Sequence, residues 1–432
     1  MLIPDADHYW LKNAHIPACL LESGQFNPQT REGLVLVDLQ ISQGIITKIL
    51  LAPSPVSNIP EVDLKKSLIF PRFVDLHTHL DKSHIWQRSP NPTGTFEQAL
   101  NTVKLDVEKY WQAEDVLRRM DFSLQCSYAH GTRAIRTHID AAGKQGEMSF
   151  GIFQELQSAW SERLIMQAVS LVSLDYYQTP DGLTLADKIA EIGGILGGVA
   201  YMSDGLDDQL DTVFSLAKER NLDLDFHADE NDDPNSICLH KIAQAALRNE
   251  FSGYILCGHC CSLTVQPPAV VSKTIDLVKQ AGIAIVSLPL CNLFLQGRQE
   301  FQTPYWRGIT KVRELQQAGI PVAFASDNCR DPFYGFGDND ILEVLSQAVK
   351  IAHLDTDYGD WCRSVTQTAA DLMKLPQLGR IKVGLPADFI IFTARYFSEL
   401  FSRPQSDRLI VQHGKSIEAS LPNYSELDDL VL

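Results

Sequence analysis

Apolar runs rich in β-branched residues alternate with long amphipathic segments from Ser67 onward, and this alternation constrains the fold more than any other feature. Runs such as AIRTHID, DLDFHAD, YILCGH and VAFASD have the length of buried strands, whereas the segments between them follow the helical period. Alternating strands and helices form a parallel sheet with crossover helices. The sequence therefore predicts an α/β fold.

Polar residues at the predicted strand ends indicate which kind of sheet forms. A barrel of eight βα units over about 250 residues gives each unit roughly 31 residues and carries its catalytic groups at the carboxyl ends of the strands. His227 and His259 are 32 residues apart, and His259 and Asp327 are 68 apart. His138 precedes His227 by 89 residues. These gaps correspond to one, two and nearly three units. In a TIM-like (β/α)8 barrel, they place His138 on strand 2, His227 on strand 5, His259 on strand 6 and Asp327 on strand 8.

Both ends of the chain carry strand patterns without long helices. Alternating apolar runs with Gly, Asn and Pro turns begin at about Ile16, and similar runs return in the last fifty residues. We expect residues 1–66 and 380–432 to form one composite β-sandwich domain. Residues 67–379 would form the (β/α)8 barrel.

His77 and His79 end the first predicted strand of the barrel, FVDLHTH. The second strand ends 61 residues after His77, so the first unit needs an extra helix, which the helical stretch 98–126 supplies. Because side chains alternate along a strand, a His-x-His pair points both imidazoles to one face. Together with His227 and Asp327, they offer three nitrogens and one carboxylate, which suits Zn²⁺ or Fe²⁺ with an open position for water. Six histidines outside this pattern are interpreted as ordinary core or surface residues: His8, His15, His130, His240, His353 and His413.

Glu230 follows His227 by three residues, just beyond the predicted strand end. A carboxyl group there can reach a metal-bound water without binding the metal, which is the position of a general acid or base. The alternative is a solvated glutamate in an acidic loop, because Asp229, Asp232 and Asp233 surround it.

Composition excludes several partners. The chain has 37 Lys and Arg against 54 Asp and Glu, a net charge of −17, which repels phosphate backbones and anionic lipid. We therefore expect neither nucleic acid nor a membrane as a partner. Nine scattered cysteines, no basic and apolar leader and no long uncharged apolar segment predict a cytoplasmic protein with reduced thiols.

Longer motifs contain the same residues. FVDLHTHLDKS, RTHID, FHADENDD, NLFLQGR, SDNCRDPFYGFG and GRIKVGLPADFIIF occur in this order over roughly residues 65–395. The series resembles the amidohydrolase superfamily, and within it the bacterial cytosine deaminase branch, with further similarity to N-alkylammelide hydrolases. The resemblance implies one divalent metal ion, Zn²⁺ or Fe²⁺, held by His77, His79, His227 and Asp327. It also implies catalytic roles for Glu230, His259 and Asp327.

The implied activity is that of a metal-dependent aminohydrolase, which removes an exocyclic amine from a pyrimidine-like or related nitrogen heterocycle and releases ammonia. Asp327 would accept a proton from a metal-activated water, and Glu230 would protonate the ring nitrogen beside the reacting carbon. One alternative is a hydrolase of N-substituted triazines or another cyclic amidine or amide. The other is a non-catalytic barrel protein. We expect a small heterocyclic substrate and a homo-oligomer.

The residues expected to contact the substrate differ from those of cytosine deaminases. Ser173 stands where the branch has a glutamine that reads the pyrimidine edge, Asn328 replaces an acidic residue, and Phe333 replaces a tryptophan. Lys82, in the ammelide-like HLDKS motif, either contacts the substrate or forms a salt bridge with a nearby carboxylate. Gln296 is either a substrate contact or a structural amide. We therefore expect weak activity on cytosine and better activity on a related ring, such as isocytosine or an oxo-triazine.

Overall fold

The computed structural model of the chain describes residues 3–21, 26–356, 358, 360–404 and 406–431. The chain divides into two compact units, each assembled from separate segments. The first unit comprises residues 1–74, 127–133 and 341–421, and the second comprises residues 75–126, 134–340 and 422–432. The domain boundaries expected from the sequence, after residues 66 and 379, stay a prediction.

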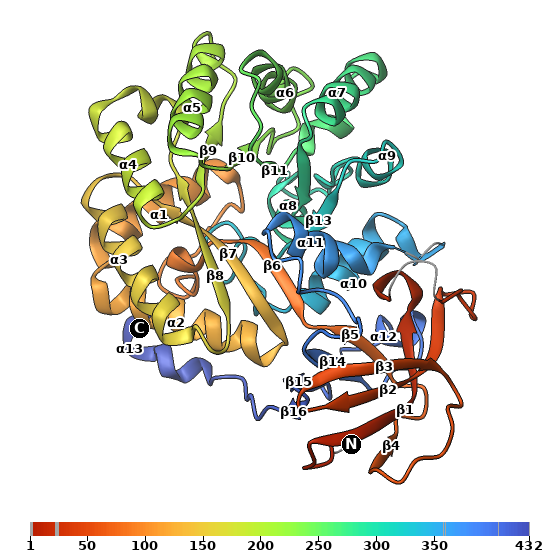
Figure 1. Cartoon of the computed structure of the whole chain (residues 1–432). Helices are drawn as coiled ribbons and strands as arrows, with labels where there is room; N and C mark the ends of the chain where they lie inside the picture. Colours follow the sequence, from red (N-terminus) through yellow and green to blue (C-terminus); the bar gives the residue numbers. More distant parts are fainter. Residues whose placement is uncertain (1–2, 22–25, 357, 359, 405, 432) are drawn as a thin grey trace. The chain divides into compact units, whose positions relative to one another are not determined.

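The first unit contains a mixed sheet to which strands from both ends of the chain contribute (Figure 1). The strands lie in the order β16, β15, β14, β5, β1, β2, β3, and β4 pairs with β1. Their bounds are β1 (His8–Pro17), β2 (Leu34–Ser42), β3 (Ile45–Leu51), β4 (Glu61–Asp63), β5 (Leu68–Pro71), β14 (Phe389–Phe392), β15 (Leu409–Gln412) and β16 (Lys415–Ser416). The antiparallel pairing of β5 with β14 joins the two ends, with Ile69 opposite Ile391.

The strand pattern expected from about Ile16 misses most of β1, which begins at His8. A register shift between Leu11 and Ala14 interrupts the alternation of its side chains, so the period-two signal is weak there. Apolar side chains of β1, β2, β5 and β14 pack into one buried core, which includes Leu39, Ile69, Phe389 and Ile391. This unit also contains α10 (Ile341–Ile351), α11 (Gln367–Leu372) and α12 (Phe397–Leu400).

The second unit alternates parallel strands with helices, which confirms the predicted α/β class. One sheet has the order β6, β7, β8 and the other β13, β12, β11, β10, β9. The strands are β6 (Phe73–Thr78), β7 (Thr132–Asp140), β8 (Ile165–Leu171), β9 (Leu196–Ala200), β10 (Leu224–Ala228), β11 (Ile255–His259), β12 (Ala284–Ser287) and β13 (Val322–Phe324). Isolated parallel bridges pair Ser173 with Val199, next to β8 and β9, and Thr78 with Asp327, next to β6 and β13.

Helices follow these strands along the chain (Figure 1). They are α3 (Gly143–Trp160), α4 (Pro180–Glu191), α5 (Leu206–Arg220), α6 (Cys238–Arg248), α7 (Pro268–Gln280), α8 (Pro289–Leu295) and α9 (Val312–Gln317), with α13 (Asp428–Val431) at the end of the chain. Between β6 and β7, the single helical stretch expected over 98–126 is two helices, α1 (Phe96–Tyr110) and α2 (Ala113–Ala129). Arg88 joins them, because its guanidinium forms ion pairs with Asp106 of α1 (2.8 Å) and Asp115 of α2 (2.5 Å).

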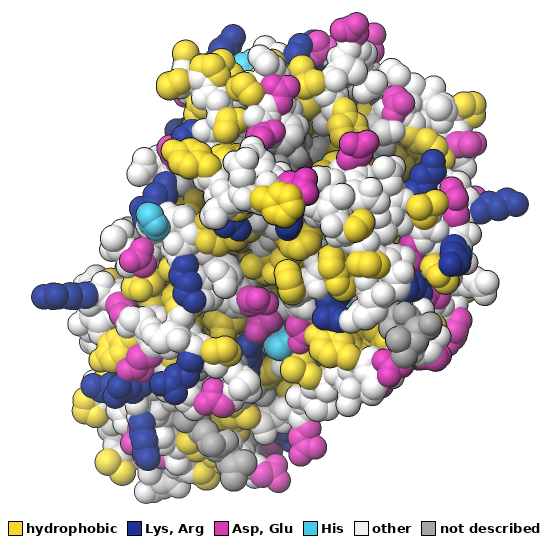
Figure 2. Space-filling model, turned by 180° about the vertical axis from the view of Figure 1, so that it is seen from behind, with side chains coloured by type: hydrophobic (Ala, Val, Ile, Leu, Met, Phe, Trp, Pro, Cys, Tyr) yellow, Lys and Arg dark blue, Asp and Glu magenta, His cyan; other side chains and the backbone are white. Residues whose placement is uncertain are grey.

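Charged side chains on the face drawn in Figure 2 are interspersed, with basic and acidic groups alternating among apolar ones. Over the described part of this face, no continuous basic band of the kind that follows a phosphate backbone is visible. In the part of the chain that the structure describes, no helix is both long and apolar enough to span a membrane. The cysteines of the described residues are free thiols, and none belongs to a candidate metal cluster there.

Candidate active site

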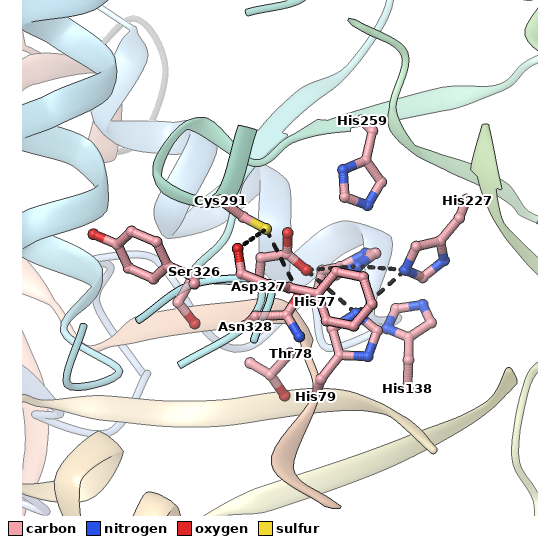
Figure 3. Close-up of polar contacts among 12 residues, drawn as sticks. His77, Thr78, His79, His138, His227, His259, Cys291, Ser326, Asp327 and Asn328 are labelled. Atoms are coloured by element: carbon pink, nitrogen blue, oxygen red, sulfur yellow. Dashed lines mark hydrogen bonds and ion pairs between the residues drawn. The ribbon is translucent and has the colours of Figure 1, made fainter. Parts of the chain in front are cut away.

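Strand ends of the second unit bring five histidines and Asp327 together (Figure 3). Each side chain comes from the carboxyl end of its strand or from the first three residues beyond it, where parallel strands present their polar groups. The six residues are His77 on β6, His79 after it, His138 on β7, His227 on β10, His259 on β11 and Asp327 after β13.

Four of these side chains converge on one point. His227 Nε2 lies 3.2 Å from His77 Nε2 and 3.3 Å from His79 Nε2. Asp327 Oδ1 lies 3.2 Å from His79 Nε2 and 3.5 Å from His77 Nε2. Ligand atoms about 2.0–2.1 Å from one tetrahedral metal ion lie roughly 3.3–3.4 Å from each other. The arrangement therefore fits a single divalent metal ion.

The polar atoms of this cluster suit a bound cation. Asp327 is buried, and neither of its carboxylate oxygens accepts a hydrogen bond from an N–H or O–H group of the described residues. Burial raises the pKa of Asp327 to about 7. Burial and the neighbouring imidazoles lower the pKa of His77 and His227 well below the usual range. Neutral imidazoles bind metals, and a buried carboxylate is stabilised by a metal charge, so the donor set suits the metal that the sequence predicts.

His138 and His259 extend the cluster. The nitrogens of His77, His79 and His138 lie close enough to one another to hold a metal ion, and so do those of His77, His227 and His259. The His138 ring lies over the His77 ring with 3.9 Å between centroids. Its Nε2 is 3.3 Å from Asp225 Oδ1 on β10, so the Asp225 carboxyl lies beside this imidazole.

Glu230 lies beside His259 in the lining of a cavity. Glu230 Oε1 is 3.2 Å from His259 Nδ1, and the Asn292 amide donates to Glu230 Oε1 at 3.3 Å and lies 3.0 Å from His259 Nδ1. Burial and the negative charge of Asp327 raise the pKa of the Glu230 carboxyl well above its usual range. Burial lowers the pKa of His259 to about 3, so its imidazole is neutral. Burial therefore favours the protonated form of the Glu230 carboxyl and the neutral form of the His259 imidazole.

The acidic residues near Glu230 have separate structural tasks. Asp229 is buried and accepts the backbone N–H groups of Cys238 (2.8 Å) and Leu239 (2.9 Å), which begin α6. Asp233 accepts the backbone N–H of Asn235 (2.8 Å) within the loop. Glu230 differs from these two because its carboxyl faces the histidine cluster. This geometry favours the acid/base interpretation over a solvated loop glutamate.

Four of the five residues predicted to contact substrate line one cavity. Lys82 forms a 2.7 Å salt bridge with Asp140, and its ammonium lies 5.8 Å from the Phe333 ring centroid. Burial lowers the pKa of Lys82, but the carboxylates of Asp140 and Asp81 outweigh it and raise the pKa overall. Asn328 donates to Asp331 at 2.7 Å, and Ser173 donates to Asp175. Thus Lys82 forms the salt bridge that was one of its two predicted roles and lines the cavity as well.

Gln296 is the exception, because it does not line this cavity among the described residues. Its Nε2 donates to the backbone carbonyl of Glu230 at 3.1 Å. The structure thus gives Gln296 the contacts of a structural amide that holds the Glu230 backbone.

The cavity has a volume of about 440 Å³, which is in the range of small-molecule sites. His79, His227, His259 and Glu230 lie along one part of it. Apolar side chains form much of the remainder, contributed by α1 and by the ends of β8 and β9: Phe96, Leu100, Val103, Val107, Leu171, Val172 and Val199. The cavity therefore combines a few polar groups with a large apolar surface.

Sequence reasoning missed three residues that contact the site. Asn292 contacts both Glu230 and His259, Asp225 lies beside His138, and Asp331 holds Asn328 and accepts the Phe333 backbone N–H at 2.8 Å. Asn292 is the first residue of the NLFLQGR motif, and Asp225 lies two residues before His227 on the same face of β10. Strand alternation could have identified Asp225. The partner of Asn292 depends on tertiary geometry.

His84 is a buried histidine outside the cluster, and it leads to a prediction about stability. Neither ring nitrogen has a hydrogen-bond partner among the described residues, and the ring packs on Phe122 with 4.8 Å between centroids. Burial and the Arg330 guanidinium lower the pKa of His84 from 6.5 to about 3. A depressed pKa means that the neutral ring stabilises the fold above pH 6.5, and that this stability is lost as the pH falls toward 3.

We expect His84→Phe to reduce the acid sensitivity of the fold. Between pH 7.5 and pH 5, the free energy of unfolding of the parental chain should fall by about 2 kcal/mol more than that of the variant. Urea unfolding at several pH values measures this difference. His413→Asn, which replaces an exposed histidine, is the control and should keep the parental pH dependence. Equal slopes for His84→Phe and the parental chain would contradict the assignment.

Comparisons with known proteins agree with this geometry. Residues 125–415 match the Amidohydrolase family model Amidohydro_3. A pterin deaminase from Rhizobium rhizogenes is 46% identical over 431 residues, 99% of this chain and 98% of its own. The crystal structure of 5-methylcytosine deaminase from Klebsiella pneumoniae liganded with 5-fluorocytosine superposes with a TM-score of 0.81 at 26% identity, covering 95% of this chain and 97% of that chain. An N-isopropylammelide isopropyl amidohydrolase from Pseudomonas sp. strain ADP is 25% identical over 348 residues, 77% of this chain and 82% of its own.

The chain belongs to the amidohydrolase family, and its α/β fold matches solved structures of that family. It is a hydrolytic enzyme that acts on carbon–nitrogen bonds, a deaminase of nitrogen heterocycles. The resemblance drawn from the sequence motifs and the predicted class of reaction are confirmed.

Proposed function

We propose that the chain hydrolyses the bond between the exocyclic amine and the ring carbon of a pterin and releases ammonia. A pterin contains a 2-amino-4-oxopyrimidine ring, the pattern of isocytosine, fused to a pyrazine ring. The observation that carries the proposal is the cavity of about 440 Å³, in which His227, His259 and Glu230 share one space with a long apolar surface. A fused bicyclic ring uses such a surface better than a single pyrimidine. The pterin deaminase that is 46% identical over nearly the whole chain supports the same choice.

The metal site is part of this proposal. His77, His79, His227 and Asp327 would hold one divalent ion, Zn²⁺ or Fe²⁺, because three imidazole nitrogens and one carboxylate suit both. When bound, the ion supplies Lewis-acid activation of a water molecule. His138 and His259 are further nitrogen donors next to this set.

The side chains around the proposed metal site have separate roles in the proton transfers. Asp327 accepts the proton that the attacking water loses. The Asn292 N–H at 3.0 Å from His259 Nδ1 leaves Nε2 of the neutral ring protonated, and His259 Nε2–H donates a hydrogen bond to the water oxygen. Glu230, whose raised pKa favours its protonated form, donates a proton to the ring nitrogen beside the amine-bearing carbon. That proton makes the carbon electrophilic, and a proton passed to the exocyclic nitrogen lets it leave as ammonia.

Asn328, Phe333, Lys82 and Ser173 would contact the ring. Asn328 is buried and its amide is held by Asp331, so it offers an oriented polar group without a charge. Ser173 offers one hydroxyl where a glutamine would pair with the edge of cytosine. We infer that this set favours the isocytosine pattern over cytosine.

Ammonia release by the purified enzyme tests the proposal. We expect kcat/KM on pterin of about 10⁴ M⁻¹s⁻¹ or more, an ordinary value for an enzyme on its own substrate. Cytosine should be at least ~100-fold poorer, because a mismatched polar edge leaves buried groups unpaired. Isocytosine and an N-alkylammelide complete the panel. A kcat/KM on cytosine or on the ammelide above that on pterin would overturn the assignment, and the ammelide result would favour a triazine hydrolase.

We also infer that the strands of the second unit close into a (β/α)8 barrel. The order β6, β7, β8 and the order β9 to β13 would join through the Ser173–Val199 and Thr78–Asp327 bridges into one ring. The composite terminal β-sandwich is the matching proposal for the first unit. Cytoplasmic location and homo-oligomeric state stay predictions from the sequence.

A further inference from the structure

One apolar wall of the cavity comes from a single face of α1. Four of its apolar side chains line the cavity at intervals of four, three and four residues, which is the spacing of one helix face. We call them the α1 wall: Phe96, Leu100, Val103 and Val107. Since α1 is part of the additional helix pair between β6 and β7, this wall is separate from the strand ends that carry the chemistry.

The α1 wall lines the part of the cavity that leads away from the histidine cluster. Phe96 packs edge-on against Phe333 with 5.6 Å between centroids, and the Lys82 ammonium lies 5.8 Å from the same Phe333 ring. The cluster end is buried, with His259 1% exposed, whereas Leu100 is 44% exposed. The wall therefore extends from the ring contacts near Phe333 to the open end of the cavity.

The apolar face that the α1 wall presents to the cavity suits an apolar group, because apolar side chains gain stability when they are covered. Lys104 and Glu108 border the wall with opposite charges, so the rim favours an uncharged group. In a pterin, the amine-bearing carbon lies on the pyrimidine ring, on the side away from the pyrazine. With that carbon at Glu230 and the histidines, the pyrazine ring points toward the open end.

We propose that the α1 wall binds an uncharged apolar or aromatic substituent on the pyrazine ring of the substrate. The substrate class is then a substituted pterin, and the unsubstituted ring leaves much of the wall uncovered. This inference rests on the proposed function and specifies the substrate of that same site.

A comparison of two leucines on α1 tests the proposal. The probes are pterin and 6-phenylpterin, each measured by ammonia release with three proteins: the parental chain, Leu100→Asn and Leu105→Asn. Leu105 is 64% exposed on the same helix and does not line the cavity, so it is the matched control. We expect the parental chain to hydrolyse 6-phenylpterin at least as efficiently as pterin. In Leu100→Asn the ratio of kcat/KM for 6-phenylpterin over pterin should fall about tenfold, the size of a lost apolar contact in a pocket. In Leu105→Asn the ratio should stay at the parental value.

The possible failures are distinguishable. If the parental chain hydrolyses both pterins and Leu100→Asn leaves the ratio unchanged, or Leu105→Asn lowers it equally, the role of the α1 wall is overturned while the deaminase function stands. The same holds if the parental chain accepts pterin and rejects 6-phenylpterin. If the parental chain hydrolyses neither compound, the proposed function is overturned, and this inference with it.

Discussion

His77→Ala is expected to give a folded chain that retains far less than one divalent metal ion and does not deaminate pterin. His77 Nε2 lies 3.2 Å from His227 Nε2 and 3.5 Å from Asp327 Oδ1, so its removal takes one of four convergent donors. Loss of a supporting residue outside the ligand set already lowers metal affinity by roughly 10–100-fold. Loss of a ligand should lower it further. Elemental analysis after dialysis, with circular dichroism to check folding, measures the effect.

Two variants sharpen this test. His240→Ala replaces a buried histidine whose Nδ1 contacts Thr274 at 3.0 Å outside the cluster, and it should retain the metal. His138→Ala asks whether this neighbouring imidazole belongs to the ligand set, because His138 is close enough to His77 and His79 to share an ion. Undiminished metal in His77→Ala would overturn the proposed set. Loss in His138→Ala alone would move the metal to the His138 side of the cluster.

Glu230→Gln should fold, bind the metal normally and lose activity by a factor on the order of 10²–10⁴, the usual contribution of a positioned acid or base. The amide has almost the same shape as the carboxyl and keeps the contact with Asn292, but it has no acidic proton to donate. Burial and the negative charge of Asp327 raise the pKa of Glu230, which favours the protonated, proton-donating form of the parental side chain. Steady-state kinetics on pterin, together with metal analysis, separates loss of the proton donor from loss of the metal.

Asp232→Asn is the matched control for Glu230→Gln. It removes an exposed carboxylate from the same loop, two residues along the chain. Its turnover should stay at the parental level. Near-parental turnover in Glu230→Gln would return Glu230 to the solvated-loop interpretation and require another proton donor.

The repeating length of βα units explains why so much of the site was predictable. His138, His227 and His259 were assigned to strands 2, 5 and 6 from their spacing, and they lie on β7, β10 and β11, the second, fifth and sixth strands counted from β6. Spacing works here because each unit repeats a similar number of residues and presents its polar group at the same end. Their exact ligand roles stay predictions.

Contacts between distant side chains could not be predicted in this way. Lys82 pairs with Asp140 rather than with the adjacent Asp81, because the two strand ends lie side by side in the folded unit. Asn292 reaches Glu230 and His259 from α8, a helix that no periodic pattern links to them. The break between α1 and α2 was also missed, since both helices have similar amphipathic character.

The pairing of β5 with β14 has a consequence for synthesis of the chain. After β5 has been translated, about 320 further residues must be added before β14 can pair with it, because Pro71 pairs with Phe389. At a translation rate of about 5–20 residues per second, β5 lacks this partner strand for roughly 15–60 s. During that time, the apolar strand LIFP has an open hydrogen-bonding edge, which is the feature that recruits other nascent chains into aggregates. The yield of soluble enzyme should therefore depend on elongation speed and on chaperones that cover this edge on the ribosome.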